Sequence, residues 1–148
     1  MNIKTLAKEL NQKYIRDIDS AAGKVGPYYF IVEPASLVGL IRVTFSVKSA
    51  EAYLQEFQET MAHFRAIGRD GVRITNHQLI LECKVNGLEH SEDFAQILES
   101  IGNTLHDHNI PQVDFQGKES DNLGVFRVGT KLEVQTDDTI QGVSSTIK

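Results

Sequence analysis

Residues 40–48, LIRVTFSVK, alternate apolar and polar side chains from Ile41 onward. Successive side chains of a β-strand point to opposite faces, so this stretch predicts a strand with one face in a core and the other in water. Such a half-buried sheet is typical of antiparallel strands joined by hairpins. The polar set comprises Arg42, Thr44, Ser46 and Lys48.

Further strands are predicted on both sides of this stretch. Residues 28–33 read as a strand that forms a hairpin with 40–47, and residues 72–75 and 78–85 read as a second hairpin. In the second hairpin Leu79, Leu81, Cys83 and Val85 fall on the inward register. The outward register then holds Gln78, Ile80, Glu82 and Lys84.

Three amphipathic helices are predicted from apolar residues at helical spacing, over residues 2–21, 49–68 and 91–108. The order helix, hairpin, helix, hairpin, helix (α-ββ-α-ββ-α) predicts an α+β fold with two layers. We expect a mainly antiparallel sheet with the helices on one face, followed by a C-terminal hairpin.

The chain of 148 residues suffices for one compact domain. We expect residues 1–110 to form this α+β domain. Residues 111–135 are interpreted as an appended loop and short hairpin, with strands at 125–128 and 131–134. Residues 136–148 are polar and are interpreted as a tail or linker.

Composition argues against two classes of function. Twenty Asp and Glu against fifteen Lys and Arg give a net charge of −5, so on average the chain repels nucleic-acid phosphates and no nucleic-acid partner is expected. No apolar run approaches the roughly 18 residues of a membrane span, so no membrane insertion is expected. The N-terminus lacks a signal-peptide core, and one cysteine suits a reducing compartment. We therefore expect a cytoplasmic protein.

Catalytic and cofactor motifs are missing from the sequence. It contains neither GxGxxG nor GxSxG, and Cys83 lies on the inward register, where an apolar environment disfavours the thiolate. We expect no catalytic residue and no cofactor.

The best concentration of metal-ligand types is weak. It consists of His106, Asp107 and His108, followed by acids in the loop, and the candidate metal ligands among them are His106, His108 and Asp114. Helical positions two apart point about 200° from each other, so the two histidines could share a metal only beyond the end of a helix. A favourable contact of the imidazoles with the helix dipole is the simpler interpretation, and a metal-assisted hydrolase stays an alternative.

The polar strand positions are the candidate site. A solvated face is the simplest explanation, but Ile80 lies among polar neighbours where a purely solvated face would not need it. We expect a non-catalytic protein-interaction or regulatory module whose partner is another protein or a second copy in a homodimer. The candidate partner-binding residues are Arg42, Thr44, Ser46, Lys48, Ile80, Glu82 and Lys84.

Two resemblances accompany this interpretation. Over residues 2–108 the element order resembles the type III secretion chaperone fold, which implies a non-catalytic dimer that binds unfolded client segments. Residues 113–118, VDFQGK, with the predicted hairpin at 125–134, resemble a zinc ribbon that follows a cytosolic domain in some bacterial membrane proteins. Here the cysteines of that ribbon are missing. The second resemblance implies that the chain could be the soluble part of a larger protein.

Overall fold

The strand predicted at residues 40–48 lies inside a six-stranded sheet in the computed structural model, which describes residues 1–75 and 77–113. Every neighbouring pair of strands is antiparallel, in the order β1-β2-β3-β4-β6-β5. The strands are β1 (Lys13–Ile15), β2 (Ser20–Val25), β3 (Tyr28–Pro34), β4 (Leu40–Ser46), β5 (Val72–Thr75) and β6 (Gln78–Lys84).

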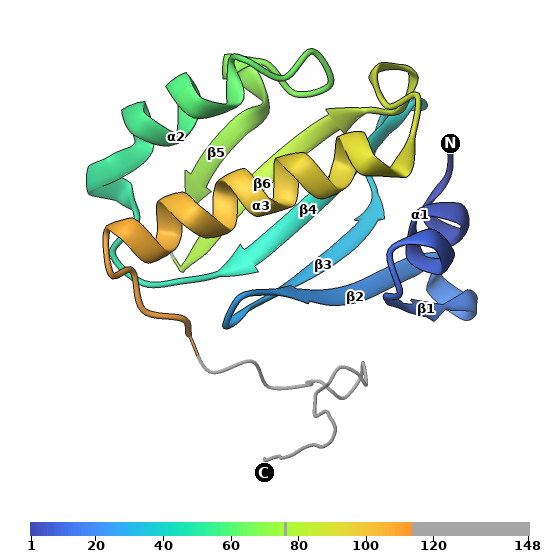
Figure 1. Ribbon diagram of the computed structural model, residues 1–148, viewed down its shortest axis with the longest axis horizontal. Coiled ribbons are helices and arrows are strands. Elements are labelled where there is room, and N and C mark those ends of the chain that lie inside the picture. Colours follow the sequence, from blue (N-terminus) through green and yellow to red (C-terminus); the bar gives the residue numbers. More distant parts are fainter. Residues whose placement is uncertain (76, 114–148) are drawn as a thin grey trace, which may run out of the picture. The chain divides into compact units, whose positions relative to one another are not determined.

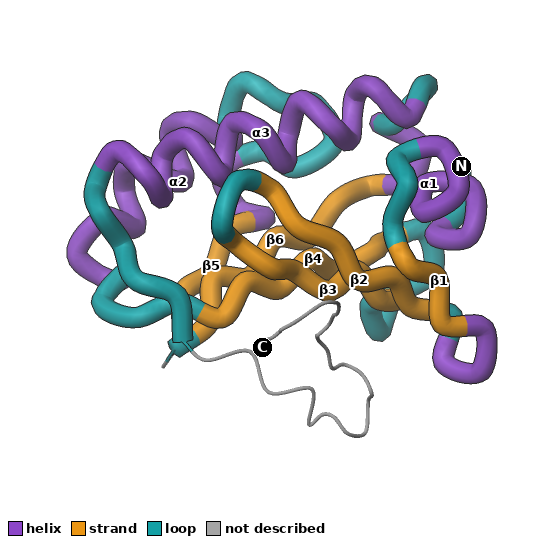
Figure 2. The backbone as a smooth tube through the Cα atoms, turned by 60° about the horizontal axis from the view of Figure 1, so that its bottom comes forward, coloured by secondary structure: helices purple, strands orange, loops and turns teal. Residues whose placement is uncertain are grey.

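Helices of the described chain cover one face of this sheet. Figure 1 shows α3 (Ser91–Asp107) crossing over β4 and β6, with α2 (Leu54–Met61) beside it and α1 (Ile3–Glu9) near β1. The view in Figure 2 shows the helices on the same side of the strands. The predicted α+β class, the antiparallel sheet and the one-sided helix layer are therefore confirmed.

The hydrophobic core lies between the sheet and the helices, as the alternation in β4 predicted. Ile41, Val43 and Phe45 are buried, and the rings of Phe30 and Phe45 pack with centroids 5.5 Å apart. Helix α3 contributes the predicted apolar stripe. Its buried core residues are Phe94, Ile97, Leu98, Ile101 and Leu105.

The prediction of one helix over residues 2–21 was wrong, because α1 ends at Glu9. Asn11 adopts a left-handed conformation with φ of 59°, and the Gln12 amide donates to the Ala7 carbonyl at 2.8 Å. This pair of features is the Schellman termination, in which a left-handed residue follows the last helical turn. Residues 13–25 instead form β1 and β2, joined by a short 3₁₀ turn (Arg16–Ile18).

This change alters the element order. The described chain runs α1-β1-β2-β3-β4-α2-β5-β6-α3, so four strands, rather than one hairpin, separate the first two helices. The second helix is also shorter than predicted. A 3₁₀ turn (Glu51–Tyr53) precedes α2, and after Met61 the chain continues in turns, with the Phe64 amide donating to the Met61 carbonyl.

Residues Met1–Pro111 form one compact unit. No helix in the described part of the chain is long and apolar enough to span a membrane. The predicted C-terminal hairpin at 125–134 and the tail at 136–148 lie outside the described residues.

Candidate functional site

The sheet face opposite the helices is the candidate site, and we call it the outer face. Strand pairing defines it, because directly paired residues point to the same side of a sheet. One row of paired residues crosses all six strands. It runs Lys13, Ala22, Ile31, Thr44, Ile80 and Arg73, so the apolar residues lie inside the row and cations stand at both ends.

Ile80 is the most enclosed apolar residue of this row. The residue is only 8% exposed, although it points away from the helices and is not part of the cluster that forms the main core. Thr44 and Arg73 stand opposite it on the two neighbouring strands, and Glu82 follows it on the same face of β6. The centre of the outer face is therefore apolar and framed by polar side chains.

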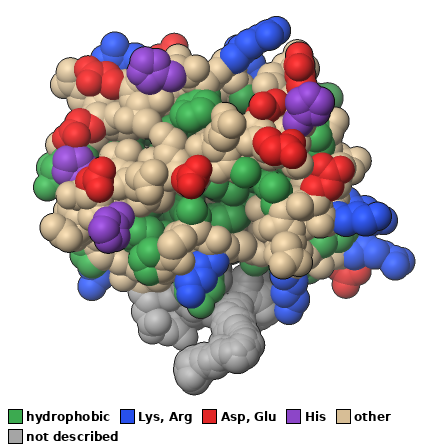
Figure 3. All heavy atoms as spheres, viewed as in Figure 1, with side chains coloured by type: hydrophobic (Ala, Val, Ile, Leu, Met, Phe, Trp, Pro, Cys, Tyr) green, Lys and Arg blue, Asp and Glu red, His purple; other side chains and the backbone are tan. Residues whose placement is uncertain are grey.

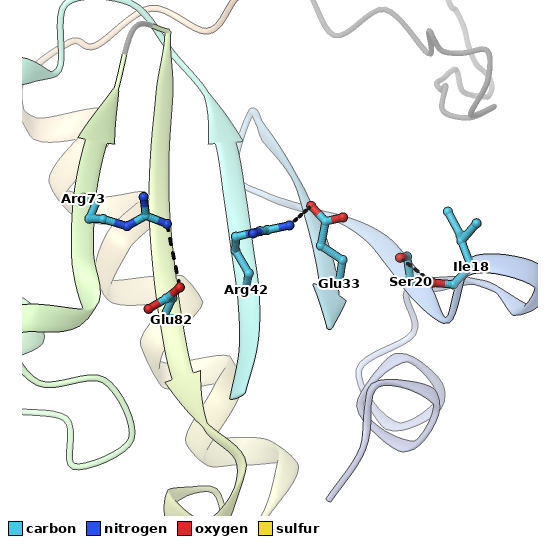
Figure 4. A network of polar contacts seen from close by, with 6 residues as sticks. All are labelled: Ile18, Ser20, Glu33, Arg42, Arg73 and Glu82. Carbon is cyan, nitrogen blue, oxygen red and sulfur yellow. Dashed lines mark hydrogen bonds and ion pairs between the residues drawn. The ribbon is translucent and has the colours of Figure 1, made fainter. Parts of the chain in front are cut away.

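Two ion pairs lie on the outer face, one between β3 and β4 and the other between β5 and β6. The Arg42 guanidinium is 3.5 Å from the Glu33 carboxylate, and the Arg73 guanidinium is 3.7 Å from the Glu82 carboxylate. Figure 4 shows both arginine side chains extending across to their carboxylates on the adjacent strands. Each arginine thus has a neighbouring acid, and partly exposed pairs of this kind contribute at most about 1 kcal/mol to stability.

Six of the seven predicted binding residues lie together on this face. Arg42, Thr44 and Ser46 occupy β4, and the pairing of Thr44 with Ile80 brings β6 beside them. The other two on β6 are Glu82 and Lys84. The seventh, Lys48, follows the end of β4, and its backbone amide donates to the Pro111 carbonyl at 2.9 Å.

Several residues of the outer face were not predicted from the sequence. Lys13 was predicted to lie in the first helix and Lys24 was assigned to no element, whereas β1 and β2 place both on this face, and Lys24 Nζ lies 5.3 Å from the ring centre of Tyr29. Two exposed apolar residues, Leu37 and Val38, lie in the β3–β4 connection at the end of the same strands. The sequence did carry a signal for Leu37 and Val38, because two aliphatic residues stand in a connection between strands, where turn residues are usually polar.

The opposite, helix-covered side of the molecule has a different charge. The segment from Glu51 to Met61 and helix α3 contain seven acidic residues and no Lys or Arg. Figure 3 shows Asp, Glu and His side chains spread over this side, with Lys and Arg toward its periphery. The acids are Glu51, Glu56, Glu59, Glu92, Asp93, Glu99 and Asp107.

The two candidate metal-binding histidines point to different surroundings. The His106 side chain is 77% exposed, whereas His108, at the end of α3, is 25% exposed. The His108 ring stacks on Tyr53 with centroids 4.2 Å apart, and its Nε2 lies 2.8 Å from Glu56 Oε2. Within residues 1–75 and 77–113 no three ligand-type side chains are grouped to hold a metal. Asp114 lies outside the described residues.

Cys83 is placed as the sequence predicted. It is fully buried under the helix layer, and burial raises the pKa of its thiol to about 12. A thiol in this state supplies almost no thiolate near neutral pH, so it is a poor nucleophile.

A shallow depression of about 260 Å³ lies where the chain before β5 meets the start of α3. His63, Arg65 and Asp93 are among its lining residues. The Asp93 carboxylate already accepts hydrogen bonds from the amides of Glu89 and His90, which caps α3. Asp93 therefore has a structural role at the start of α3.

Comparison with protein-family models, with curated proteins and with solved structures found no match for this chain.

Proposed function

We propose that this chain is a non-catalytic protein-interaction module that binds its partner through the outer face of the sheet. The observation that carries the proposal is the enclosed, outward-pointing Ile80 at the centre of that face. A strand face that only contacts water gains nothing from an isoleucine, whereas interfaces combine an apolar centre with a polar rim.

The rim is supplied by residues that suit recognition. The hydroxyls of Thr44 and Ser46 and the Arg42–Glu33 pair are polar groups at fixed positions on regular strands. Because strands hold their side chains in register, such a face presents donors and acceptors without ordering a loop on binding. The exposed Leu37 and Val38 add apolar contact area beside the face.

The proposal includes a cytoplasmic location. The single cysteine is buried and forms no disulfide, which agrees with a reducing compartment. A homodimer and a client-binding dimer are forms of the same proposal in which the occupant of the outer face is a second copy or an unfolded segment.

Site-specific photo-crosslinking in the cell tests the proposal. A benzoylphenylalanine in place of Lys84 reports on the outer face, and the same group in place of Glu99 on α3 is the matched control, since both positions are exposed. We expect a discrete adduct from position 84 that is absent from position 99 and is lost when Ile80→Asp is added. Equal adducts from both positions, or none from position 84, would contradict the proposal.

A further inference from the structure

Charge is distributed unequally between the two layers of the fold. Every charged residue of the six strands lies on the outer face, and there are five basic and two acidic ones, a net charge of +3. The segment from Glu51 to Met61 and helix α3 carry seven acidic residues and no Lys or Arg, while the whole chain has a net charge of −5. The strand residues are Lys13, Lys24, Glu33, Arg42, Arg73, Glu82 and Lys84.

The acids of the outer face are already neutralised. Glu33 is paired with Arg42, and Glu82 with Arg73. Within residues 1–75 and 77–113 neither Lys13 nor Lys84 forms an ion pair. The charge that remains available on this face is therefore positive, and its complement is a negatively charged surface.

Resting on the proposed function, we infer that the partner is an acidic polypeptide segment with an apolar side chain among its carboxylates. The apolar side chain would pack on the partly exposed Ile31, beside the enclosed Ile80, and the carboxylates would approach the lysines of the surrounding strands. Strands lie about 4.8 Å apart, so the row from Lys13 to Arg73 spans roughly 24 Å, the length of about seven extended residues. One short segment can therefore reach both cationic edges.

Other occupants fit this face less well. For a nucleic acid the aromatic residues are too few, because Tyr29 is the sole aromatic residue among the outward positions of the six described strands. Stacking on several aromatic rings is the usual means by which a sheet holds unpaired bases. A second copy bound face to face would oppose two surfaces of net charge +3, which repel each other.

NMR titration of the full-length protein tests the inference. The probe is a synthetic peptide, DEDLVLDED, and the comparison probes are the same peptide with its apolar residues replaced by glycine, and a single-stranded DNA oligonucleotide. We expect the acidic apolar peptide to shift amide signals of β2, β3, β4 and β6, with an affinity that falls as salt is added.

Two double charge variants test whether peptide affinity depends on the lysines of the outer face or only on the net charge of the protein. Lys13→Glu with Lys84→Glu should weaken peptide binding about tenfold, whereas Lys4→Glu with Arg65→Glu, which makes the same change elsewhere, should weaken it less than about twofold. Glu33→Gln with Glu82→Gln frees both arginines and should strengthen binding. Exposed charge changes of this kind leave the fold intact, which circular dichroism verifies.

The outcomes distinguish the inference from the proposed function. Shifts on the helix layer, equal losses in both charge variants, or tighter binding of DNA to the same strands would overturn the acidic-polypeptide partner. If the peptide fails while position 84 still crosslinks in the cell, the partner chemistry inferred here is wrong and the interaction module stands. If both fail, both are wrong.

Discussion

The hydroxyl of Tyr28 donates a 2.8 Å hydrogen bond to the carbonyl oxygen of Ile110, 82 residues further along the chain. Both residues are buried, so the bond fastens the chain after α3 to the start of β3. The nearby bond from the Lys48 amide to the Pro111 carbonyl joins the same segment to the end of β4. Together they determine where the chain leaves the α+β unit.

Tyr28→Phe is therefore expected to destabilise the protein by about 1–3 kcal/mol, because the buried Ile110 carbonyl loses its partner. Urea denaturation followed by circular dichroism measures this loss. Tyr14→Phe is the matched control: its hydroxyl binds Asp19 at an exposed position, where water can replace it. Equal losses in the two variants would show that the Tyr28 hydroxyl has no special structural role.

The buried thiol of Cys83 predicts how stability changes at alkaline pH. Burial raises its pKa from 9.0 to about 12, so the folded state favours the protonated form. The resulting stabilisation is fully present below pH 9.0 and is lost as the pH rises through the folded-state value, with a slope of up to about 1.4 kcal/mol per pH unit.

Denaturant titrations at successive pH values, comparing the wild type with Cys83→Ala, measure this effect. Alanine does not titrate, so the difference in unfolding free energy between the two proteins should shrink above pH 9.0. Ellman's reagent should also label Cys83 only as fast as the protein opens. Rapid labelling of the native protein, or a constant free-energy difference, would contradict the burial of this thiol.

The sequence predicted those parts of the fold in which the residue pattern and the tertiary environment agree. In β4 the alternation from Ile41 to Val47 places every apolar side chain on the helix side, and in α3 the apolar spacing matches the buried residues. Each of these elements packs on one face only, so the spacing of its apolar residues is enough to predict which side chains are buried.

The first helix shows where that reasoning fails. Tyr14 and Ile18 continue the helical spacing of α1, yet Asn11 reverses the chain, and Ile18 is exposed. Residues 20–25, SAAGKV, have little β-propensity, and they form β2 because β3 pairs with them along its length. Because β1 and β2 were not predicted, Lys13 and Lys24 were not placed on the outer face. The positive charge of this face therefore could not be predicted from the strands that were found.

Gly71 lies where the chain enters β5, and its lack of a side chain permits a close backbone approach. A Cβ at this position would be 2.8 Å from the Glu82 carbonyl oxygen of β6 and 2.9 Å from the Ile67 side chain. Gly71→Ala should therefore cost about 1–3 kcal/mol, because the strand backbone cannot yield without disturbing the sheet. Thermal unfolding compares it with Asp70→Ala at the exposed neighbouring position, and equal midpoints would refute the close contact.

His108 is expected to act in packing. His108→Ala removes the stack on Tyr53 and the contact with Glu56, so it should lower stability by about 1 kcal/mol. His106→Ala, at an exposed position, should stay within about 0.5 kcal/mol of the wild type. Both variants are measured with added zinc and with EDTA. Zinc stabilisation that disappears equally in the two variants would instead support the metal-site alternative.

The exposed pair Leu37 and Val38 should matter for binding and not for folding. Both side chains point away from the core, so Leu37→Ser with Val38→Ser should change the unfolding free energy by less than about 0.5 kcal/mol. The same double variant should reduce the photo-adduct formed from position 84, because interface apolar residues contribute most where water is excluded on binding. Leu79→Ser, in the buried core next to Ile80, is the contrasting variant and should destabilise the fold. An unchanged adduct yield in the double variant would remove the β3–β4 connection from the binding surface and restrict that surface to the strands themselves.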